Sequence, residues 1–136
     1  EWLGGLYYTP EEGIHVPGWN IFAALIGGAK LSKPGTTLKR AATIVDNNVP
    51  IEYTGAKNPD DLFKDKSFVD MRGVKIGTAR ILRCRPIFLK WACKFTVAYD
   101  ENAIQRNELN RCVTDAGLMV GLGDYRPRFG RFEIVQ

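Results

Sequence analysis

The sequence predicts a single α+β domain, residues 1–136, in which an antiparallel sheet is backed by two helices. Some stretches alternate apolar and polar residues, which is typical of strands, and two others repeat apolar residues every three or four positions, which is typical of helices. Along the chain these stretches follow the order strand, helix, hairpin, helix, strand. An antiparallel sheet covered by helices buries the apolar faces of elements in that order.

The first part of the chain predicts two strands and a helix. We expect a strand over 2–8 and a short returning strand over 14–16. Pro17 and Gly18 then precede a helix, and we expect Trp19 beside them to join the core. The buried stripe of this helix has helical spacing and consists of Ile21, Phe22, Leu25, Ile26 and Ala29.

An elaborated segment separates the first helix from the central hairpin. We expect an exposed basic loop over 30–40, which contains a Pro-Gly turn, and two short strands at 43–45 and 51–53. Asn58 has the residue type of an N-cap, and a proline and two acids follow it. This pattern predicts a short helix that ends near Lys66.

The strongest strand signal runs over 74–99 and predicts the central hairpin. Over 89–99 every odd position is apolar, which gives the period of two expected for a strand. The stretch 79–85 alternates as well, and Pro86 separates the two runs as a turn or an edge bulge. Four cations fall on the polar side and predict a basic sheet face: Arg83, Arg85, Lys90 and Lys94.

The last elements are a helix and a strand. Asp100 is a candidate N-cap with Glu101 in the first turn, and an apolar stripe with helical spacing runs over 109–120. We expect the helix to end near Gly121 and the strand to cover 129–135. The complete order favours a ferredoxin-like (split βαβ) arrangement. Because RNA-recognition modules, enzymes and interaction domains all use this architecture, it assigns no function by itself.

Composition excludes several function classes. The net charge is +4 and 45% of the residues are hydrophobic, as in ordinary globular proteins. No apolar run is long enough for a membrane span, so we expect no membrane contact. The chain has one histidine, His15, and three cysteines without CxxC spacing. These residues are too few and too far apart in sequence to indicate a zinc site or Cys–His catalysis. We therefore predict no cofactor, no metal and free, buried thiols, which favours a reducing compartment.

Acidic residues provide a weaker, enzymatic alternative. Metal-binding carboxylates for a phosphodiester-cleaving enzyme are available at Asp46, Asp60, Asp61, Asp65 and Asp70. Their spacing matches no metal motif, and a solvated acidic turn is the favoured interpretation. We predict a protein without enzymatic activity and keep the metal-dependent nuclease as a third hypothesis.

The stretch GLGDYRPRFGRFEIVQ predicts a loop that follows a phosphate backbone. Its glycines can adopt positive φ and present N–H groups as an anion site, and guanidinium groups suit phosphate oxygens. Tyr125 and Phe129 can stack on an unpaired base. The alternative is a polar turn in which Arg131 pairs with Glu133 or Asp124. The candidate binding residues of the loop are Gly121, Gly123, Tyr125, Arg126, Arg128, Gly130 and Arg131.

Two motifs resemble those of the RAMP superfamily, the ferredoxin-like proteins of CRISPR effector backbones. IHVPGWNIFAALIGGAK is similar to the start of the family's first helix, and GLGDYRPRFGRFEIV is similar to its C-terminal glycine-rich loop. With the GTAR…RCRPIF segment, the chain also resembles uncharacterised proteins of tailed bacteriophages. The RAMP resemblance implies a ferredoxin-like core and single-stranded RNA or DNA bound by the loop and a neighbouring basic surface. Trp19 and Asn20 replace a common small hydroxyl residue, and the catalytic histidine of RNA-cleaving relatives has no counterpart.

Our leading hypothesis is a non-enzymatic, single-stranded nucleic-acid-binding protein of phage origin. The alternative is a phage structural or host-defence-inhibiting protein that acts through protein–protein contacts, as a homo-oligomer or with another partner. A sheet edge, or the apolar Trp2, Leu3 and Tyr7, would form that contact. We expect the cytoplasm as the location, that of the host cell if the protein is phage-encoded. The sequence begins with Glu1 rather than Met, so we expect an N-terminal piece to precede it.

Overall fold

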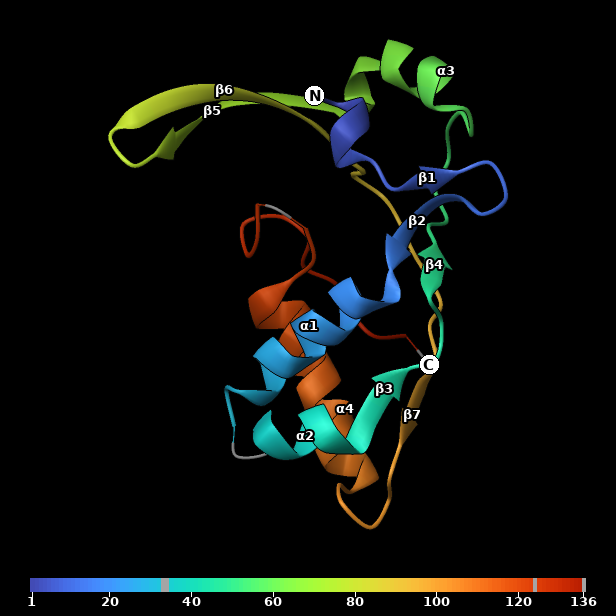
Figure 1. Ribbon diagram of the computed structural model, residues 1–136, viewed down its shortest axis with the longest axis vertical. Coiled ribbons are helices and arrows are strands. Elements are labelled where there is room, and N and C mark those ends of the chain that lie inside the picture. Colours follow the sequence, from blue (N-terminus) through green and yellow to red (C-terminus); the bar gives the residue numbers. More distant parts are fainter. Residues whose placement is uncertain (33–34, 124, 136) are drawn as a thin grey trace. The chain divides into compact units, whose positions relative to one another are not determined.

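The protein combines helices with small antiparallel sheets. A computed structural model describes residues 1–32, 35–123 and 125–135 (Figure 1). The predicted α+β class is confirmed. The strands form three separate ladders, in the orders β1-β2-β4, β3-β7 and β5-β6, and the ferredoxin-like arrangement stays a prediction. Among the described residues, no helix has both the length and the apolar character that crossing a bilayer requires.

The chain divides into two compact units. Unit 1 consists of 1–16 and 48–94, and unit 2 consists of 17–47 and 95–136. Each unit has its own cluster of buried apolar side chains. The single domain that the length predicts therefore contains two separately packed parts.

Unit 1 contains a small three-stranded sheet, a short helix and a long hairpin. Its elements are η1 (Leu3–Gly5), β1 (Tyr8–Thr9), β2 (Gly13–Pro17), β4 (Asn48–Pro50), α3 (Pro59–Lys64), η2 (Lys66–Phe68), β5 (Val69–Ile76) and β6 (Ala79–Pro86). The expected strand over 14–16 and the helix that begins after Asn58 are confirmed. The Asn58 side chain accepts a hydrogen bond from the Asp60 N–H at 2.8 Å, which caps α3.

The core of unit 1 forms around Trp2. The Trp2 indole is buried and its Nε1–H donates to the Phe68 carbonyl at 3.0 Å. Phe68 packs edge-to-face on Phe88 with ring centroids 5.6 Å apart. The predicted strand over 2–8 is wrong, because η1 occupies Leu3–Gly5 and only Tyr8 of that stretch lies in a strand, β1. Trp2 is therefore an anchor of the core and not a docking surface for a partner.

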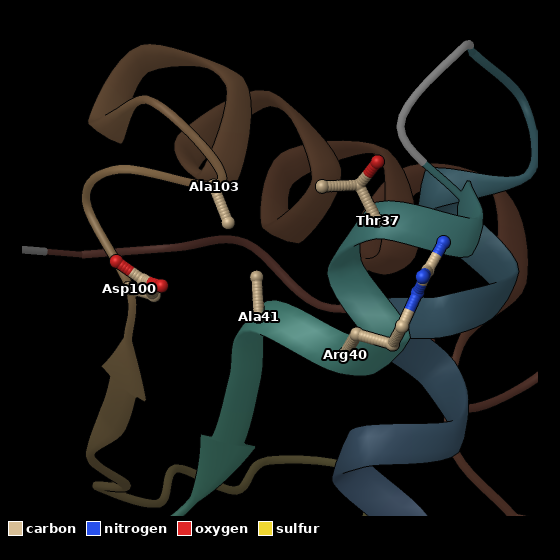
Figure 2. Close-up of a pocket in the computed structure, with 5 residues that line it drawn as sticks. All are labelled: Thr37, Arg40, Ala41, Asp100 and Ala103. Carbon is tan, nitrogen blue, oxygen red and sulfur yellow. The ribbon is translucent and has the colours of Figure 1, made fainter.

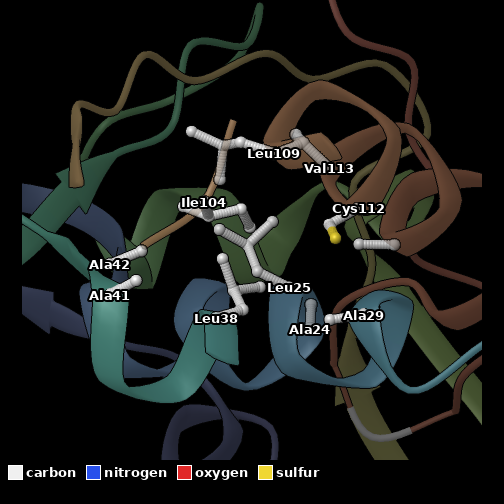
Figure 3. Close-up of a cluster of buried hydrophobic side chains, with 11 residues drawn as sticks. Ala24, Leu25, Ala29, Leu38, Ala41, Ala42, Ile104, Leu109, Cys112 and Val113 are labelled. Carbon is white, nitrogen blue, oxygen red and sulfur yellow. The ribbon is translucent and has the colours of Figure 1, made fainter. Parts of the chain in front are cut away.

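Unit 2 is mostly helical. Its elements are α1 (Gly18–Ala29), α2 (Gly35–Ala41), β3 (Ala42–Ile44), β7 (Val97–Tyr99), α4 (Arg106–Asp115) and the π-helix η3 (Ala116–Val120). Figure 3 shows Leu25 of α1, Leu38 of α2 and Ile104 converging in the core. A Cβ at Gly28 would overlap the Cys112 carbonyl and the Ala116 backbone, so glycine allows α1 and α4 to approach closely.

Several element predictions in unit 2 need correction. The expected loop over 30–40 contains α2, whose Leu38 is fully buried; Lys33 and Pro34 lie outside the described residues. Trp19 is not in the core, because 69% of it is exposed. The last helix does not begin at Asp100, which caps a turn by accepting the Asn102 N–H at 2.9 Å; α4 starts later.

The predicted strand over 89–99 is confirmed only at its end, and the predicted strand over 129–135 is wrong. Of the stretch 89–99, only β7 is a strand, together with an isolated bridge between Ala92 and Glu52. The described residues of 129–135 form no strand. Leu89 is 75% exposed, so the apolar side of the alternating run is not packed at its start, whereas Phe95 and Val97 further along it pack against the core of unit 2.

Candidate nucleic-acid interface

The residues 121–131, here called the C-terminal loop, follow the π-helix. Gly121 has φ +78° and ends η3, and its N–H donates to the Ala116 carbonyl at 2.8 Å. Gly123 and Gly130 also have positive φ, at +93° and +85°. The prediction that these glycines take left-handed conformations is confirmed.

Two backbone hydrogen bonds close the loop. The Leu122 N–H donates to the Gly130 carbonyl at 3.0 Å, and the Phe132 N–H donates to the Gly117 carbonyl at 3.0 Å. A Cβ at Gly130 would overlap the Leu122 carbonyl, and one at Gly117 would overlap the Phe132 carbonyl. Glycine is therefore required at both closures, which hold the loop against the end of η3.

Contacts inside the loop order its aromatic and basic side chains. The Phe129 N–H donates to the Tyr125 carbonyl at 2.8 Å, and the two rings lie 5.5 Å apart at 39°. The Arg126 Nη1 donates to the Gly123 carbonyl at 2.9 Å. The Arg128 guanidinium lies 5.9 Å from the centre of the Phe129 ring. Aromatic and cationic groups therefore alternate along a short, internally bonded turn.

The guanidinium groups of the loop are exposed, and none has a carboxylate partner among the residues that the structure describes. Arg126, Arg128 and Arg131 are all exposed. Within the ranges 1–32, 35–123 and 125–135, no carboxylate lies within 4.0 Å of their nitrogens. The alternative pairing of Arg131 with Glu133 is therefore absent, and Asp124 lies outside the described residues.

The β5–β6 hairpin, residues 69–86, carries the second group of predicted cations. Arg83 and Arg85 lie on one face, as predicted, opposite Arg72 and Asp70 of β5. Asp70 accepts two hydrogen bonds from Arg72, at 2.9 and 2.8 Å. Arg72 and Arg83 carry like charges and face each other across the ladder, and Asp70 on the same strand partly neutralises Arg72.

Glu1 neutralises the other arginine of that facing pair. Its Oε1 accepts the Cys84 N–H at 2.9 Å and its Oε2 lies 3.2 Å from the Arg83 Nη1. The backbone hydrogen bond from Cys84, followed by the bond from Arg83, lowers the pKa of the Glu1 carboxyl below its ordinary value. The hairpin cations Arg72 and Arg83 are thus engaged by carboxylates of the same chain.

Lys90 and Lys94 do not extend the basic face. Both are exposed, but they lie in the stretch 87–96, which the structure does not assign to a strand. The predicted face of four cations on one sheet is therefore wrong in this form. Only Arg83 and Arg85 share a strand and a side.

Sequence reasoning missed the acidic partners. For Asp70 a signal existed, since Asp70 and Arg72 stand two residues apart and so share one side of a strand. For Glu1 no local signal exists, because 82 residues separate it from Arg83. Neighbouring residues in the sequence therefore indicate that Arg72 is neutralised, but they do not indicate that Arg83 is.

Other candidate residues have structural roles. His15 is buried and its Nδ1 lies 2.9 Å from the Gly13 carbonyl. All three cysteines are free, but the prediction of buried thiols holds for Cys112 and is wrong for Cys84 and Cys93, which are half-buried. Burial raises the pKa of the Cys93 and Cys112 thiols. The raised pKa disfavours the reactive thiolate form of Cys93 and Cys112.

The candidate metal carboxylates are dispersed. Asp46 accepts the Thr96 N–H, Asp65 accepts from Ser67, and Asp70 binds Arg72. Among the residues that the structure describes, no group of three or more His, Cys, Asp or Glu side chains is arranged to hold a metal ion. This distribution gives the nuclease hypothesis no support.

A small cavity of about 270 Å³ lies in unit 2. Its lining residues are Thr37, Arg40, Ala41, Asp100 and Ala103, which Figure 2 shows on α2 and on the turn after β7. One cation and one carboxylate are present, but no histidine or thiol among these residues can activate the Thr37 hydroxyl. These five lining residues alone therefore assign no activity to the cavity.

The chain matches no protein-family model, no curated protein and no solved structure. The resemblance to the RAMP superfamily and to tailed-phage proteins stays a prediction.

Proposed function

We propose that this protein binds single-stranded nucleic acid, RNA or DNA, without enzymatic activity, and that the C-terminal loop is its principal contact. One observation carries the proposal: three exposed arginines on a loop closed at both ends, with no described carboxylate within 4.0 Å. A guanidinium that is not neutralised by a carboxylate keeps its charge available to an external anion.

The chemistry of the loop suits a polynucleotide better than a small anion. Guanidinium groups bind phosphate oxygens in a bidentate manner, and Arg126, Arg128 and Arg131 offer several of them along a short path. Tyr125 and Phe129 provide faces on which unpaired bases can stack. Because the hydrogen bonds from Leu122 and Phe132 hold the loop closed, less conformational entropy is lost on binding.

The hairpin cations have a secondary role in this proposal. Arg83 is held by Glu1, so its contribution to binding is smaller than that of an unengaged arginine. Arg85, Lys90 and Lys94 add long-range attraction for phosphate. The proposal retains the ferredoxin-like relationship, a phage origin and the host cytoplasm as the place of action.

Filter binding of labelled single-stranded oligonucleotides at two salt concentrations tests the proposal. We expect binding at low salt that weakens steeply as salt rises, because phosphate contacts release counterions. A labelled duplex of the same length serves as the control and should bind more weakly, since its bases are not free to stack. Absence of binding at low salt would end the proposal.

Protein–protein contact is the second candidate function. The exposed apolar side chains of unit 1 favour it, among them Leu3, 60% exposed, and Tyr7, 46% exposed. In that case the protein would act as a phage structural component or an inhibitor of a host defence. Size-exclusion chromatography would then show a stable homo-oligomer or a complex that oligonucleotides do not change.

A further inference from the structure

The β5–β6 hairpin exposes apolar side chains on both of its faces. The register places Met71 and Leu82 on one face, where they are 59% and 61% exposed. Ile76 and Ile81 lie on the other face and are 47% and 42% exposed. Figure 1 shows the two strands side by side as one long curved ribbon. A two-stranded ribbon with apolar groups on both faces is only marginally stable in water and gains from a third strand.

The edge of β6 that faces away from β5 has a defined set of backbone groups. The Cys84 N–H donates to Glu1 and so points away from β5. Outward-pointing residues alternate along an antiparallel strand, so the N–H and C=O groups of Leu82 and Arg80 face the same way. They form a short row of donors and acceptors that an added strand can pair with.

The half of the hairpin nearest its turn, residues 73–82, contains cations that pair with no described carboxylate. Lys75 lies directly opposite Arg80 in the ladder, and both are exposed. In the described part of the chain, no carboxylate lies within 4.0 Å of either side chain. The whole stretch 71–99 contains no aspartate or glutamate. Two like charges in direct opposition destabilise a ladder, so an external anion at this point would be stabilising.

At the base of β6, Glu1 already makes the two contacts that an acidic partner could make near the turn of the hairpin. There, the single carboxylate of Glu1 accepts an edge N–H from Cys84 and also pairs with Arg83. The edge of β6 therefore already accommodates an acidic side chain in this position. Two and four residues before Cys84 on β6, the outward N–H groups of Leu82 and Arg80 have no such partner among the residues that the structure describes.

We propose that the outward edge of β6 over 80–82 binds an extended acidic segment of another protein, which adds to the hairpin as a third strand. Main-chain hydrogen bonds to Arg80 and Leu82 supply the attachment. The charge pattern supplies specificity: an acidic residue opposite Arg80 also reaches Lys75, and apolar residues opposite Ile81 and Leu82 cover their exposed side chains. This surface lies in unit 1 and does not depend on the proposed nucleic-acid contact of the C-terminal loop.

The first test uses fluorescence anisotropy with the full chain and a labelled peptide that alternates glutamate with valine. The same peptide with lysine in place of glutamate is the ligand control. We expect the glutamate peptide alone to bind, and the double variant Lys75→Glu/Arg80→Glu to weaken its binding about tenfold or more. The matched variant Lys64→Glu/Lys66→Glu makes the same charge change on α3 and η2 and should leave peptide binding within about twofold.

Amide hydrogen exchange measured by NMR distinguishes strand addition from a general charge effect. Only strand addition slows the exchange of particular amides of β6. On addition of the glutamate peptide, the amides of Arg80 and Leu82 should exchange more slowly, while those of Ile81 and Arg83, already paired with β5, should change little. The inference is overturned if the lysine peptide binds equally, if no amide of β6 gains protection, or if a single-stranded oligonucleotide protects Arg80 and Leu82 and the peptide does not. Failure of the oligonucleotide at the C-terminal loop would leave this result unchanged, so the two proposals fail separately.

Discussion

The base of the β5–β6 hairpin and the C-terminal loop contain the same kind of side chain in opposite circumstances. In the hairpin, Arg72 is bound by Asp70 and Arg83 by Glu1, at 2.8 and 3.2 Å. In the loop, Arg126, Arg128 and Arg131 are exposed without a carboxylate partner in the described ranges. Similar arginine density in the sequence therefore corresponds to internal ion pairing in one region and to available charge in the other.

The difference shows that the number of cations in a segment does not measure its capacity to bind anions. A guanidinium paired within the fold must lose one partner to gain another, and the net gain in free energy is small. A guanidinium without a carboxylate partner gives up no ion pair when it binds an external phosphate, and it releases counterions. We therefore expect substitutions in the loop to change binding and substitutions in the hairpin base to change stability.

Removal of all three loop arginines should have the largest effect. The variant Arg126→Ala/Arg128→Ala/Arg131→Ala should bind a single-stranded oligonucleotide about 100-fold more weakly at low salt, and the slope of log affinity against log salt should fall by about 2. Filter binding over a salt series measures both quantities. A variant with the same charge change elsewhere in unit 2, Lys39→Ala/Arg106→Ala/Arg111→Ala, should change affinity less than about threefold. Equal losses in the two variants would mean that only net charge matters.

Gly130→Ala should have the next largest effect, because it disturbs the closure of the loop. The residue has φ +85° and its added Cβ would overlap the Leu122 carbonyl. We expect the free energy of unfolding to fall by about 1–3 kcal/mol and oligonucleotide affinity to fall about tenfold. Chemical denaturation and filter binding measure these changes. Gly4→Ala, at a position with open space for a Cβ, is the control; a Gly130→Ala protein that behaves like it would show that loop geometry is unimportant.

Arg72→Ala in the hairpin should lower stability and leave oligonucleotide affinity nearly unchanged. The side chains of Arg72 and Asp70 are 28% and 15% exposed, so the substitution leaves a partly buried carboxylate without its bidentate partner. We expect a loss of about 1–2 kcal/mol in the free energy of unfolding, with oligonucleotide affinity within about threefold of the original protein. Arg128→Ala should leave stability within about 0.5 kcal/mol. If Arg72→Ala lowers affinity as much as Arg128→Ala does, the contrast between the two regions is wrong.

The smallest expected effect is the contribution of the Glu1 carboxyl to the pH dependence of the free energy of unfolding. Its pKa lies below the ordinary value of 4.5 in the folded protein, so the folded state is stabilised above that pH, and this stabilisation is lost as the pH falls through the lowered pKa. Glu1→Gln should therefore flatten the decline in stability below pH 4.5, as measured by urea unfolding between pH 3 and 6. Glu11→Gln, in the exposed turn before β2, controls for the removal of one carboxyl. Identical pH profiles of Glu1→Gln and the original protein would contradict a role for Glu1 in holding β6.

Elements with local signals could be predicted from the sequence, and elements that depend on distant partners could not. The Asn58 cap, the apolar stripe that contains Leu25, and the positive φ of Gly121 are all determined by a few neighbouring residues. The alternation around Leu89 is also local, but a strand needs a neighbouring strand, and that residue remains exposed.

The same distinction applies to the candidate site. The glycines and arginines of the loop could be predicted as candidate site residues from the sequence. Conformational freedom and charge are properties of these residue types themselves. The neutralisation of Arg83 depends on Glu1, which lies 82 residues away along the chain. Trp19 was expected in the core on the basis of its residue type, yet it is exposed on the first turn of α1. Burial of a single aromatic is set by tertiary packing, which its neighbours in the sequence do not specify.

The most direct measurement is chemical-shift mapping of the full chain with a single-stranded oligonucleotide at low salt. If the C-terminal loop is the principal anion-accepting surface, the amide signals that shift most will belong to residues 121–131, and those of 69–86 will move little. Shifts confined to the hairpin, with the loop signals unchanged, would contradict this account.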